Sequence, residues 1–352
     1  MDEQRATAFV ERLSRDINST LSCYNLWLGL KLNLFRGLDE LGAANSRELA
    51  ARTGCVERYV REWLECMYAG EFLEYDAATE KFSLAPEYAA VLLDETNLLY
   101  GASSLFALPS VAGILPMLAN AFRNGGGVPF AAYGEGLRES ISKGNRPLFV
   151  NEYVSKWIPA LPDVETKLRA GGRVADIGCG EGWSSIALAQ GFTNIRVDGV
   201  DVDADSIEMA KQHAHAAGVA DRVLFHLASA EHQPLEGSYD LVTAFECLHD
   251  MAYPVAVLKM IHALAAPDGT VLIADEAVHD ALPDNQNFMG HYFYNWSVLH
   301  CLPQAMFFPD AAGTGTVMRP ATLREYAREA GFTGVQILPI ENPGWRFYRL
   351  TP

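Results

Sequence analysis

Apolar and polar positions follow two different patterns along this chain, and the change falls at about Gly172. Before it, apolar residues recur at helical spacing, as in Leu26 to Phe35 and Tyr59 to Met67, which predicts a largely helical region. After it, short apolar runs alternate with helical segments, beginning with Val174 to Ile177. Strands separated by helices form parallel sheets, so the second half of the chain is predicted to be an α/β domain.

The helical region has the element order of a winged helix. Two helices are predicted over residues 5–37, a short one over 47–53 behind the capping pair Asn45-Ser46, and another over 57–68. Residues 72–84 alternate and turn, which predicts a hairpin. We expect three parts in the chain: a winged helix over 1–100, a helical linker or lid over 101–165, and the α/β domain over 166–352.

Composition limits the partners and the cell compartment. The formal charge is −17, which disfavours binding to nucleic acid or to anionic membranes. The six cysteines show no paired spacing, so we expect reduced thiols and a cytoplasmic location. Residues 98–122 are apolar enough to raise the question of a membrane span, but Pro109 and Pro116 interrupt them. We therefore expect a buried helix pair there and no membrane partner.

Three glycines at every second position follow the apolar run that ends at Ile177. Gly178, Gly180 and Gly182 predict a tight turn between a strand and a helix, where a ligand can approach the backbone without meeting a Cβ atom. An ordinary strand-to-helix turn rarely needs three alternating glycines. The turn is therefore predicted to be a ligand-binding loop.

Two acids at strand ends indicate which ligand this loop binds. Asp176 can take up an ammonium group directly or through water, and Asp201, at the end of the next strand, can accept both hydroxyls of a ribose. A cationic amino acid joined to a nucleoside is S-adenosylmethionine. The alternative is NAD, whose motif G-x-G-x-x-G has a different glycine spacing.

More polar residues fall at the ends of the following strands, where ligands bind in open α/β sheets. Ser229-Ala230-Glu231 follows the third predicted strand, and Phe245 ends the fourth. His249 lies just beyond Phe245, and Asp275 follows the fifth strand, residues 270–274. A histidine at this edge can accept the proton of a hydroxyl group, although it could equally be a helix-capping or core residue.

Residues 277–320 form an insert before the last helix and two closing strands, the last of them antiparallel. The insert is rich in aromatic residues, which suits a pocket for an aromatic or apolar small molecule, although core packing explains most of them equally well. The candidate substrate-binding residues are Glu246, His291, Tyr294, Trp296 and His300. Five residues could in principle ligate a metal: Glu246, His249, Asp250, Glu276 and His279. No tight zinc spacing is present, so we expect no metal.

Four segments of the chain, residues 57–64, 174–185, 246–251 and 313–320, together resemble one bacterial family. This family comprises winged-helix class I S-adenosylmethionine-dependent methyltransferases, some of them regulator-like. The resemblance implies a Rossmann-like seven-stranded sheet, S-adenosylmethionine as the cofactor and a small-molecule methyl acceptor, most often methylated at oxygen.

The resemblance also implies roles for individual residues. His249 resembles the base of plant-type O-methyltransferases, and Asp275 resembles the acid beside that base. Ser229 stands where the family often has an acid for the adenine amino group, with Glu231 as the candidate substitute, and Glu181 stands where histidine is common. The implied cofactor-binding residues are Asp176, Gly178, Gly180, Gly182, Asp201, Val202, Ser229, Ala230, Glu231 and Phe245.

Two other functions stay open at this point, a winged-helix DNA-binding regulator and an enzyme that binds S-adenosylmethionine without transferring its methyl group. The helix at 57–68 holds Arg58 and Arg61 but also three glutamates, whereas a groove-reading helix should be basic. A role in dimerisation and in covering the substrate fits better. Leu21 to Phe35 is apolar nearly all round, which predicts a homodimer through residues 1–100, with the second subunit helping to close the pocket near 291–300.

Overall fold

The chain divides into two compact units in the computed structural model, which describes residues 1–232 and 235–352. The first unit comprises Met1–Leu108 with Glu139–Pro147, and the second comprises Pro109–Arg138 with Leu148–Pro352. Two helices, α6 (Ser103–Asn124) and α7 (Glu135–Leu148), run from one unit into the other.

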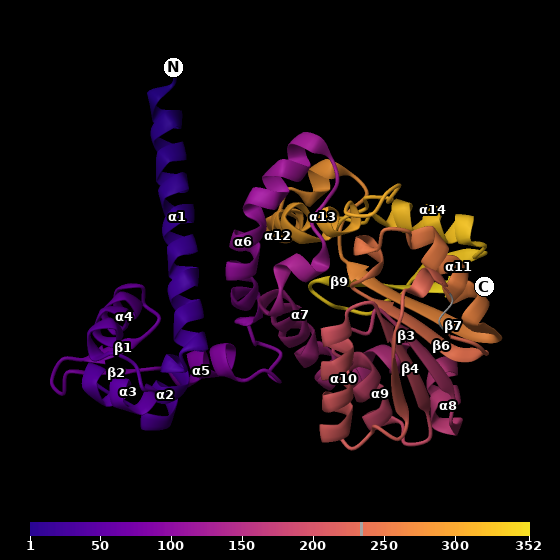
Figure 1. Cartoon of the computed structure of the whole chain (residues 1–352), viewed down its shortest axis with the longest axis horizontal. Coiled ribbons are helices and arrows are strands. Elements are labelled where there is room, and N and C mark those ends of the chain that lie inside the picture. The colour runs from indigo at the N-terminus through magenta and orange to yellow at the C-terminus, as the bar shows by residue number, and fades with distance from the viewer. Residues whose placement is uncertain (233–234) are drawn as a thin grey trace. The chain divides into compact units, whose positions relative to one another are not determined.

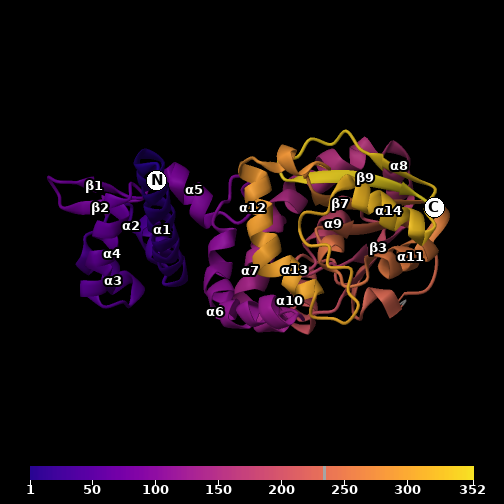
Figure 2. The same ribbon diagram turned by 90° about the horizontal axis from the view of Figure 1, so that it is seen from above.

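The first unit consists of helices followed by a small hairpin (Figure 1). Its elements are α1 (Glu3–Lys31), α2 (Leu34–Leu41), α3 (Ser46–Thr53), α4 (Glu57–Ala69), β1 (Glu74–Asp76), β2 (Lys81–Ser83) and α5 (Pro86–Leu93). Asn45 caps α3 as predicted, because its side chain accepts hydrogen bonds from the amides of Arg47 and Glu48. Figure 2 shows the antiparallel hairpin beside α4. This order confirms the predicted winged helix.

A small apolar core holds this winged helix together. The ring of Phe35 meets the indole of Trp63 edge-on at 4.9 Å, and the indole nitrogen of Trp63 donates to the carbonyl of Asn25 on α1. Both rings are buried, with Leu38, Leu49 and Leu64 around them. The first two-thirds of α1 lies outside this core, because every residue from Met1 to Leu21 is exposed.

Most of the apolar stretch at 98–122 lies in one helix, α6, which begins at Ser103, so the predicted helix pair is wrong. Pro109 and Pro116 lie inside that helix. It is also less buried than expected, with 28% of its most apolar window buried. Among the described residues, it is the one helix long and apolar enough to cross a membrane, and a single such helix is weak evidence for a span.

The second unit is built around a seven-stranded sheet. The strands are β3 (Arg173–Ile177), β4 (Arg196–Asp201), β5 (Val223–Leu227), β6 (Tyr239–Phe245), β7 (Ala265–Glu276), β8 (Gly334–Ile337) and β9 (Trp345–Thr351). Their order is β5-β4-β3-β6-β7-β9-β8. The pairs from β5 to β7 are parallel, and β9 is antiparallel to both neighbours. This topology confirms the predicted class I methyltransferase fold.

Side chains of alternate residues in the central strands pack into two separate hydrophobic cores, one on each face of the sheet. On β3, Val174 belongs to the core beneath one set of helices, and Ala175 belongs to the core on the opposite face. The first face is covered by η2 (Phe149–Trp157), η3 (Ile158–Ala160), α8 (Pro162–Ala170), α9 (Trp183–Gly191) and α10 (Ala204–Ala216). The second is covered by α11 (Pro254–Leu264) and α14 (Pro320–Ala330). Because such strands are buried on both faces, their sequences are nearly continuous runs of apolar residues.

The remaining short elements gather near the carboxyl ends of the parallel strands. They are η1 (Phe130–Tyr133), η4 (Ala230–His232), η5 (Leu248–Asp250), η6 (Leu282–Asn285), α12 (Phe288–Trp296), η7 (Ser297–Cys301) and α13 (Leu302–Ala305). The amide of Gly315 donates to the carbonyl of His249, and the amide of Ala312 donates to that of Ala252. The insert is therefore tied to the end of β6, and Figure 2 shows α12 and α13 at that end of the sheet.

Candidate active site

The glycine loop between β3 and α9 has the backbone conformation that glycine permits. Gly178, Gly180 and Gly182 all have positive φ angles, of 70°, 51° and 82°. A Cβ atom on Gly178 would meet the sulfur of Cys247 at 2.7 Å, and one on Gly182 would meet the ring of Phe225 at 2.6 Å. At Gly180, no described atom lies within 4 Å of that position. Gly180 therefore borders the open space in which a ligand can approach the loop.

The carboxylate of Asp176 holds the start of the glycine loop in place through hydrogen bonds to neighbouring elements. Its carboxylate accepts hydrogen bonds from the hydroxyls of Ser184 (2.5 Å), Ser185 (2.7 Å) and Thr243 (2.8 Å). Burial raises the pKa of Asp176, although these hydroxyls act in the opposite direction. The side chain is 2% exposed, so its direct role here is to join β3, α9 and β6. Its contact with an ammonium group stays a prediction.

Asp201 ends β4 and faces the same loop. One carboxylate oxygen accepts from the amide of Gly180 at 2.8 Å, and the other accepts from the amide of Asp203 at 2.9 Å. Each oxygen keeps a lone pair for a further donor, which is what two ribose hydroxyls would need. Val202, which follows, is 65% exposed. The contacts of both residues with the cofactor stay predictions.

Ser229, Ala230 and Glu231 form the turn after β5, the strand next to β4 in the sheet. Ala230 is buried, whereas Ser229 and Glu231 are partly exposed. The turn is thus placed where an adenine contact was predicted, and the contact itself stays a prediction.

The end of β6 adjoins the end of β3. Phe245 is buried and closes β6, and Glu246 follows with a φ angle of +50°, a conformation rare outside glycine. This turn directs the chain so that the thiol of Cys247 donates to the carbonyl of Ile177 at 3.3 Å. The glycine loop and the segment that carries His249 therefore lie side by side at one edge of the sheet.

His249, Asp275 and Glu276 form a buried charged cluster. Nδ1 of His249 lies 2.9 Å from a carboxylate oxygen of Asp275 and 3.1 Å from one of Glu276. The three side chains are 2%, 1% and 3% exposed. Because both neighbours of Nδ1 are acceptors, we assign the proton of the neutral imidazole to Nδ1, which leaves the lone pair on Nε2. The predicted pairing of His249 with Asp275 is present.

The pKa values of this cluster follow from burial and charge. Burial by itself lowers the pKa of His249, but the carboxylates of Glu276 and Asp275 raise it, and the result lies well above the ordinary value. Burial pushes the pKa of Asp275 upward, yet the charge of His249 holds it below its ordinary value. Burial raises the pKa of Glu276 well above its usual range. Asp275 is therefore the carboxylate that pairs with the imidazolium form of His249, whereas burial disfavours ionisation of Glu276.

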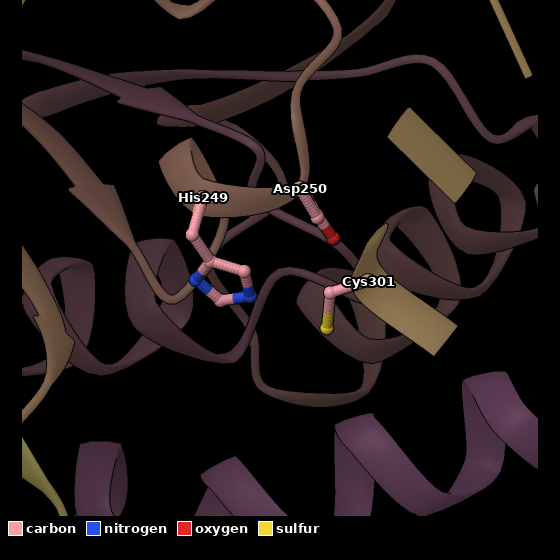
Figure 3. A group of neighbouring side chains, drawn as sticks. All are labelled: His249, Asp250 and Cys301. Carbon is pink, nitrogen blue, oxygen red and sulfur yellow. The ribbon is translucent and has the colours of Figure 1, made fainter. Parts of the chain in front are cut away.

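Two segments bring further groups to the other side of the His249 ring: the turn after β6 carries Asp250, and the insert after β7 carries His300 and Cys301. Asp250, whose pKa burial raises to about 7, and the thiol of Cys301 lie close to the imidazole (Figure 3). His300 packs edge-on against the ring of Tyr133 at 5.0 Å. Burial, together with the charge of His249, lowers the pKa of His300 to about 3, so His300 is neutral.

The predicted substrate-binding residues divide into two groups. Glu246 and His300 lie in the region of His249. Glu246 is three residues before His249 in the same turn, and the charge of His249 lowers the pKa of His300. On α12, His291 is exposed, whereas Tyr294 and Trp296 are partly buried. No hydrogen bond, ion pair or ring contact among the described residues joins those three to His249, and their contacts with a substrate stay predictions.

Sequence reasoning missed three members of the site. Glu276 was weighed only as a metal ligand, because the fifth strand was predicted to end at Ala274, whereas β7 continues through Glu276. Cys301 lies far from His249 along the chain, as Tyr133 does from His300, and each pair is brought together only by the fold. Only the proximity of Cys301 to the predicted residue His300 could have suggested it.

Comparison with known proteins identifies the class to which this fold and site belong. Residues 168–318 match a family model described as a methyltransferase domain, and residues 23–93 match one described as an Rv2258c-like winged HTH domain. The chain is 32% identical, over 184 residues, to a ubiquinone biosynthesis O-methyltransferase of Ralstonia nicotianae, covering 52% of this chain and 72% of the relative. The chain therefore belongs to the methyltransferase family, whose methyl donor is S-adenosylmethionine.

Other matches are shorter or concern the fold alone. The chain is 36% identical over 109 residues to 27-O-demethylrifamycin SV methyltransferase of Amycolatopsis mediterranei, which is 31% of this chain and 40% of that protein. It covers 61% of a methyltransferase of Streptomyces halstedii, at 29% identity. The solved structure of mitomycin 7-O-methyltransferase superimposes with a TM-score of 0.74 at 17% identity, covering 99% of both chains. At that identity the likeness shows the fold alone.

Proposed function

We propose that this protein transfers the methyl group of S-adenosylmethionine to a hydroxyl oxygen of a small, aromatic or apolar molecule. The observation that carries the proposal is the buried pair of His249 and Asp275 next to the glycine loop, with Nδ1 held at 2.9 Å by the carboxylate. The names of the relatives, which specify O-methylation of small molecules, support the choice of oxygen as the acceptor atom.

The residues of the loop fit S-adenosylmethionine. Gly180 borders open space, the carboxylate of Asp201 can accept from two ribose hydroxyls, and the turn at Ser229 to Glu231 adjoins that strand end. When bound, S-adenosylmethionine supplies an electrophilic methyl group on a sulfonium. The charge of the nearby acids complements that cation.

Calorimetry with S-adenosylhomocysteine tests cofactor binding without an acceptor. We expect binding by the wild-type protein and a loss of about tenfold or more in Gly180→Val, because a β-branched residue is strained at positive φ and fills the open space. Gly113→Val on α6 is the matched control, because nothing described lies within 4 Å of that position either and its φ is not positive. Equal binding by wild type and Gly180→Val would refute the proposal.

The chain's own residues account for proton removal. At pH values above its raised pKa, His249 is neutral and its Nε2 accepts the proton of the acceptor hydroxyl as the oxygen attacks. The resulting imidazolium is stabilised by the ionised Asp275 at Nδ1. Asp275 also fixes the ring orientation and the tautomer. Burial of the cluster excludes water, which strengthens the ion pair. Orientation of the acceptor supplies the rest, because the sulfonium is already activated.

A DNA-binding role for the winged helix is the alternative that the family match over residues 23–93 favours. The charges on α4 argue against it, because Arg58 pairs with Glu62 and Arg61 pairs with Glu57. Both arginines are thereby neutralised within their own helix. Retention on heparin that decreases steeply with salt would support DNA binding, and we expect no retention at physiological salt.

We also propose that the protein is a cytoplasmic homodimer joined through residues 1–100. On α1, Leu13, Ile17 and Leu21 are 48%, 54% and 57% exposed and recur every fourth residue. A helix that displays an apolar stripe to water is only marginally stable alone, so a partner is needed to cover it. A second copy of the chain provides the same stripe and can satisfy it by two-fold symmetry.

A further inference from the structure

We propose that Nε2 of His249, the carboxylate of Asp250 and the thiolate of Cys301 form a binding site for a zinc ion, and that zinc bound there inhibits the enzyme. This inference departs from the expectation of no metal in the sequence analysis. It uses the proposed role of His249 only in its consequence for activity, whereas metal binding itself is independent of that role.

The three donor groups share one space. One ligand atom from each of His249, Asp250 and Cys301 lies within 4.8 Å of the other two, and Figure 3 shows the ring, the carboxylate and the thiol turned toward the same space. Zinc bonds of about 2.0–2.3 Å place tetrahedral donors about 3.3–3.8 Å apart. The donors therefore need to approach by about 1 Å, which a side-chain adjustment can provide.

The far side of the imidazole is already arranged as in zinc sites. A histidine that ligates zinc through one nitrogen usually donates its other N–H to a carboxylate, which fixes the tautomer. Here Nδ1 lies 2.9 Å from Asp275, with Glu276 at 3.1 Å. In the deprotonated ring the lone pair of Nε2 is consequently directed away from these acids and toward Asp250 and Cys301. Zinc binding there displaces the proton that Nε2 carries in the imidazolium.

Some buried polar atoms of residues next to Cys301 have no hydrogen-bond partner in the part of the chain that the structure describes. Nε2 of His300, Oε1 of Gln304 and Oγ1 of Thr316 are buried and have no hydrogen-bond partner among the described residues. His300 and Cys301 are in η7, and Gln304 is in α13, which follows directly. The hydroxyl of Thr316 acts to lower the pKa of Cys301, so it lies near the thiol. Buried polar atoms are normally paired, so their condition indicates a polar occupant. Zinc with its remaining water ligand would supply donors to such atoms.

The donor set selects the metal. One imidazole, one thiolate and one carboxylate suit zinc, whereas magnesium and calcium prefer oxygen ligands alone. The thiolate and the carboxylate also balance the two positive charges of the ion. Three protein ligands leave one position open, as in zinc sites that bind water.

Zinc at this site would stop proton removal. The lone pair of Nε2 cannot ligate a metal and accept the acceptor's proton at the same time. Zinc should therefore inhibit methyl transfer, and a chelator should restore it.

Metal titration of the full-length, chelator-stripped protein in a phosphine reductant tests the site directly. Cobalt(II) is the probe, because a cobalt–thiolate bond gives a charge-transfer band in the near ultraviolet, and zinc is then used to displace it. We expect one cobalt ion per chain with this band. Cys301→Ser should lose the band and bind at least about tenfold more weakly, whereas Asp250→Asn should bind more weakly but keep the band. Cys66→Ser, at an exposed cysteine of α4, should behave as wild type.

Two results would overturn the proposal: wild-type protein that shows no thiolate band, and Cys301→Ser that binds cobalt as tightly as wild type. Circular dichroism confirms that each variant is folded, and Asp250→Asn carries the test should Cys301→Ser fail to fold. Binding of S-adenosylhomocysteine is measured in parallel, so that failure of the metal site is distinguished from failure of the proposed enzyme. Zinc inhibition should be lost in Cys301→Ser and unchanged in Cys66→Ser.

Discussion

The first half of α1 and the end of β6 and β7 depart from ordinary protein structure in opposite ways. On α1, large apolar side chains such as Leu13 and Ile17 are exposed to solvent. At the sheet edge, His249, Asp275 and Glu276 are almost completely buried. Exposed apolar stripes and buried charges are both unfavourable in an isolated chain. The apolar stripe on α1 therefore indicates binding to another protein surface, and the buried charges at the sheet edge indicate binding of reactants or ions.

The largest expected effect comes from removing the base at the sheet edge. His249→Gln keeps a polar side chain but cannot accept a proton, so methyl transfer should fall by about 10²–10⁴-fold. Incubation with S-adenosylmethionine and a panel of hydroxylated aromatic molecules, followed by mass spectrometry, measures the transfer. Affinity for S-adenosylhomocysteine should be unchanged. A rate within twofold of wild type would mean that orientation alone suffices and that the buried charges are structural.

The apolar stripe on α1 is tested by making it charged. Leu13→Glu with Ile17→Glu places two like charges on the stripe and should convert a dimer into a monomer, because the exposed apolar area can no longer be buried against its copy. Light scattering at micromolar concentration should show the mass halved. Asp16→Lys, at an exposed position between the two, is the control that should leave the mass unchanged. A wild-type protein that is already monomeric would contradict the dimer.

A smaller effect is expected from neutralising Glu276. Its pKa is raised in the folded chain, so folding opposes its ionisation at any pH above the unfolded value of 4.5. Glu276→Gln should therefore stabilise the protein at neutral pH by about 1 kcal/mol or more. The gain should disappear below about pH 4, where the carboxyl group is protonated in both states. Thermal unfolding at both pH values measures this, and destabilisation at pH 7 would show that Glu276 acts as an ionised partner of His249.

Much of this architecture could be predicted from the sequence, because local pattern and fold agree there. The run Val174 to Ile177 with its three glycines identified β3 and the loop, and Asn45 marked the start of α3. Asp201 was found because strand ends in a parallel sheet meet at one edge.

The predictions from the sequence that failed, and the features it did not reveal, have physical reasons as well. Pro109 and Pro116 were expected to divide the apolar stretch, but each proline removes only one backbone donor from a helix of 22 residues, and α6 continues through both. The proximity of Cys301 to His249 depends on how the insert folds back over β6, and no local signal carries that information. The exposure of α1 was visible only once its neighbours within the unit were known.

The protonation of His249 tests the central claim most directly, because it needs no acceptor. Nuclear magnetic resonance of protein labelled at the imidazole carbons gives the titration of each histidine, and His249→Gln assigns the signal. The ion pair with Asp275 predicts a midpoint well above the ordinary value of 6.5, and Asp275→Asn should lower it. Because only the deprotonated ring can accept a proton, methyl transfer should rise with pH through that same midpoint. A midpoint at or below 6.5 in the wild-type protein, unaltered by Asp275→Asn, would contradict the account.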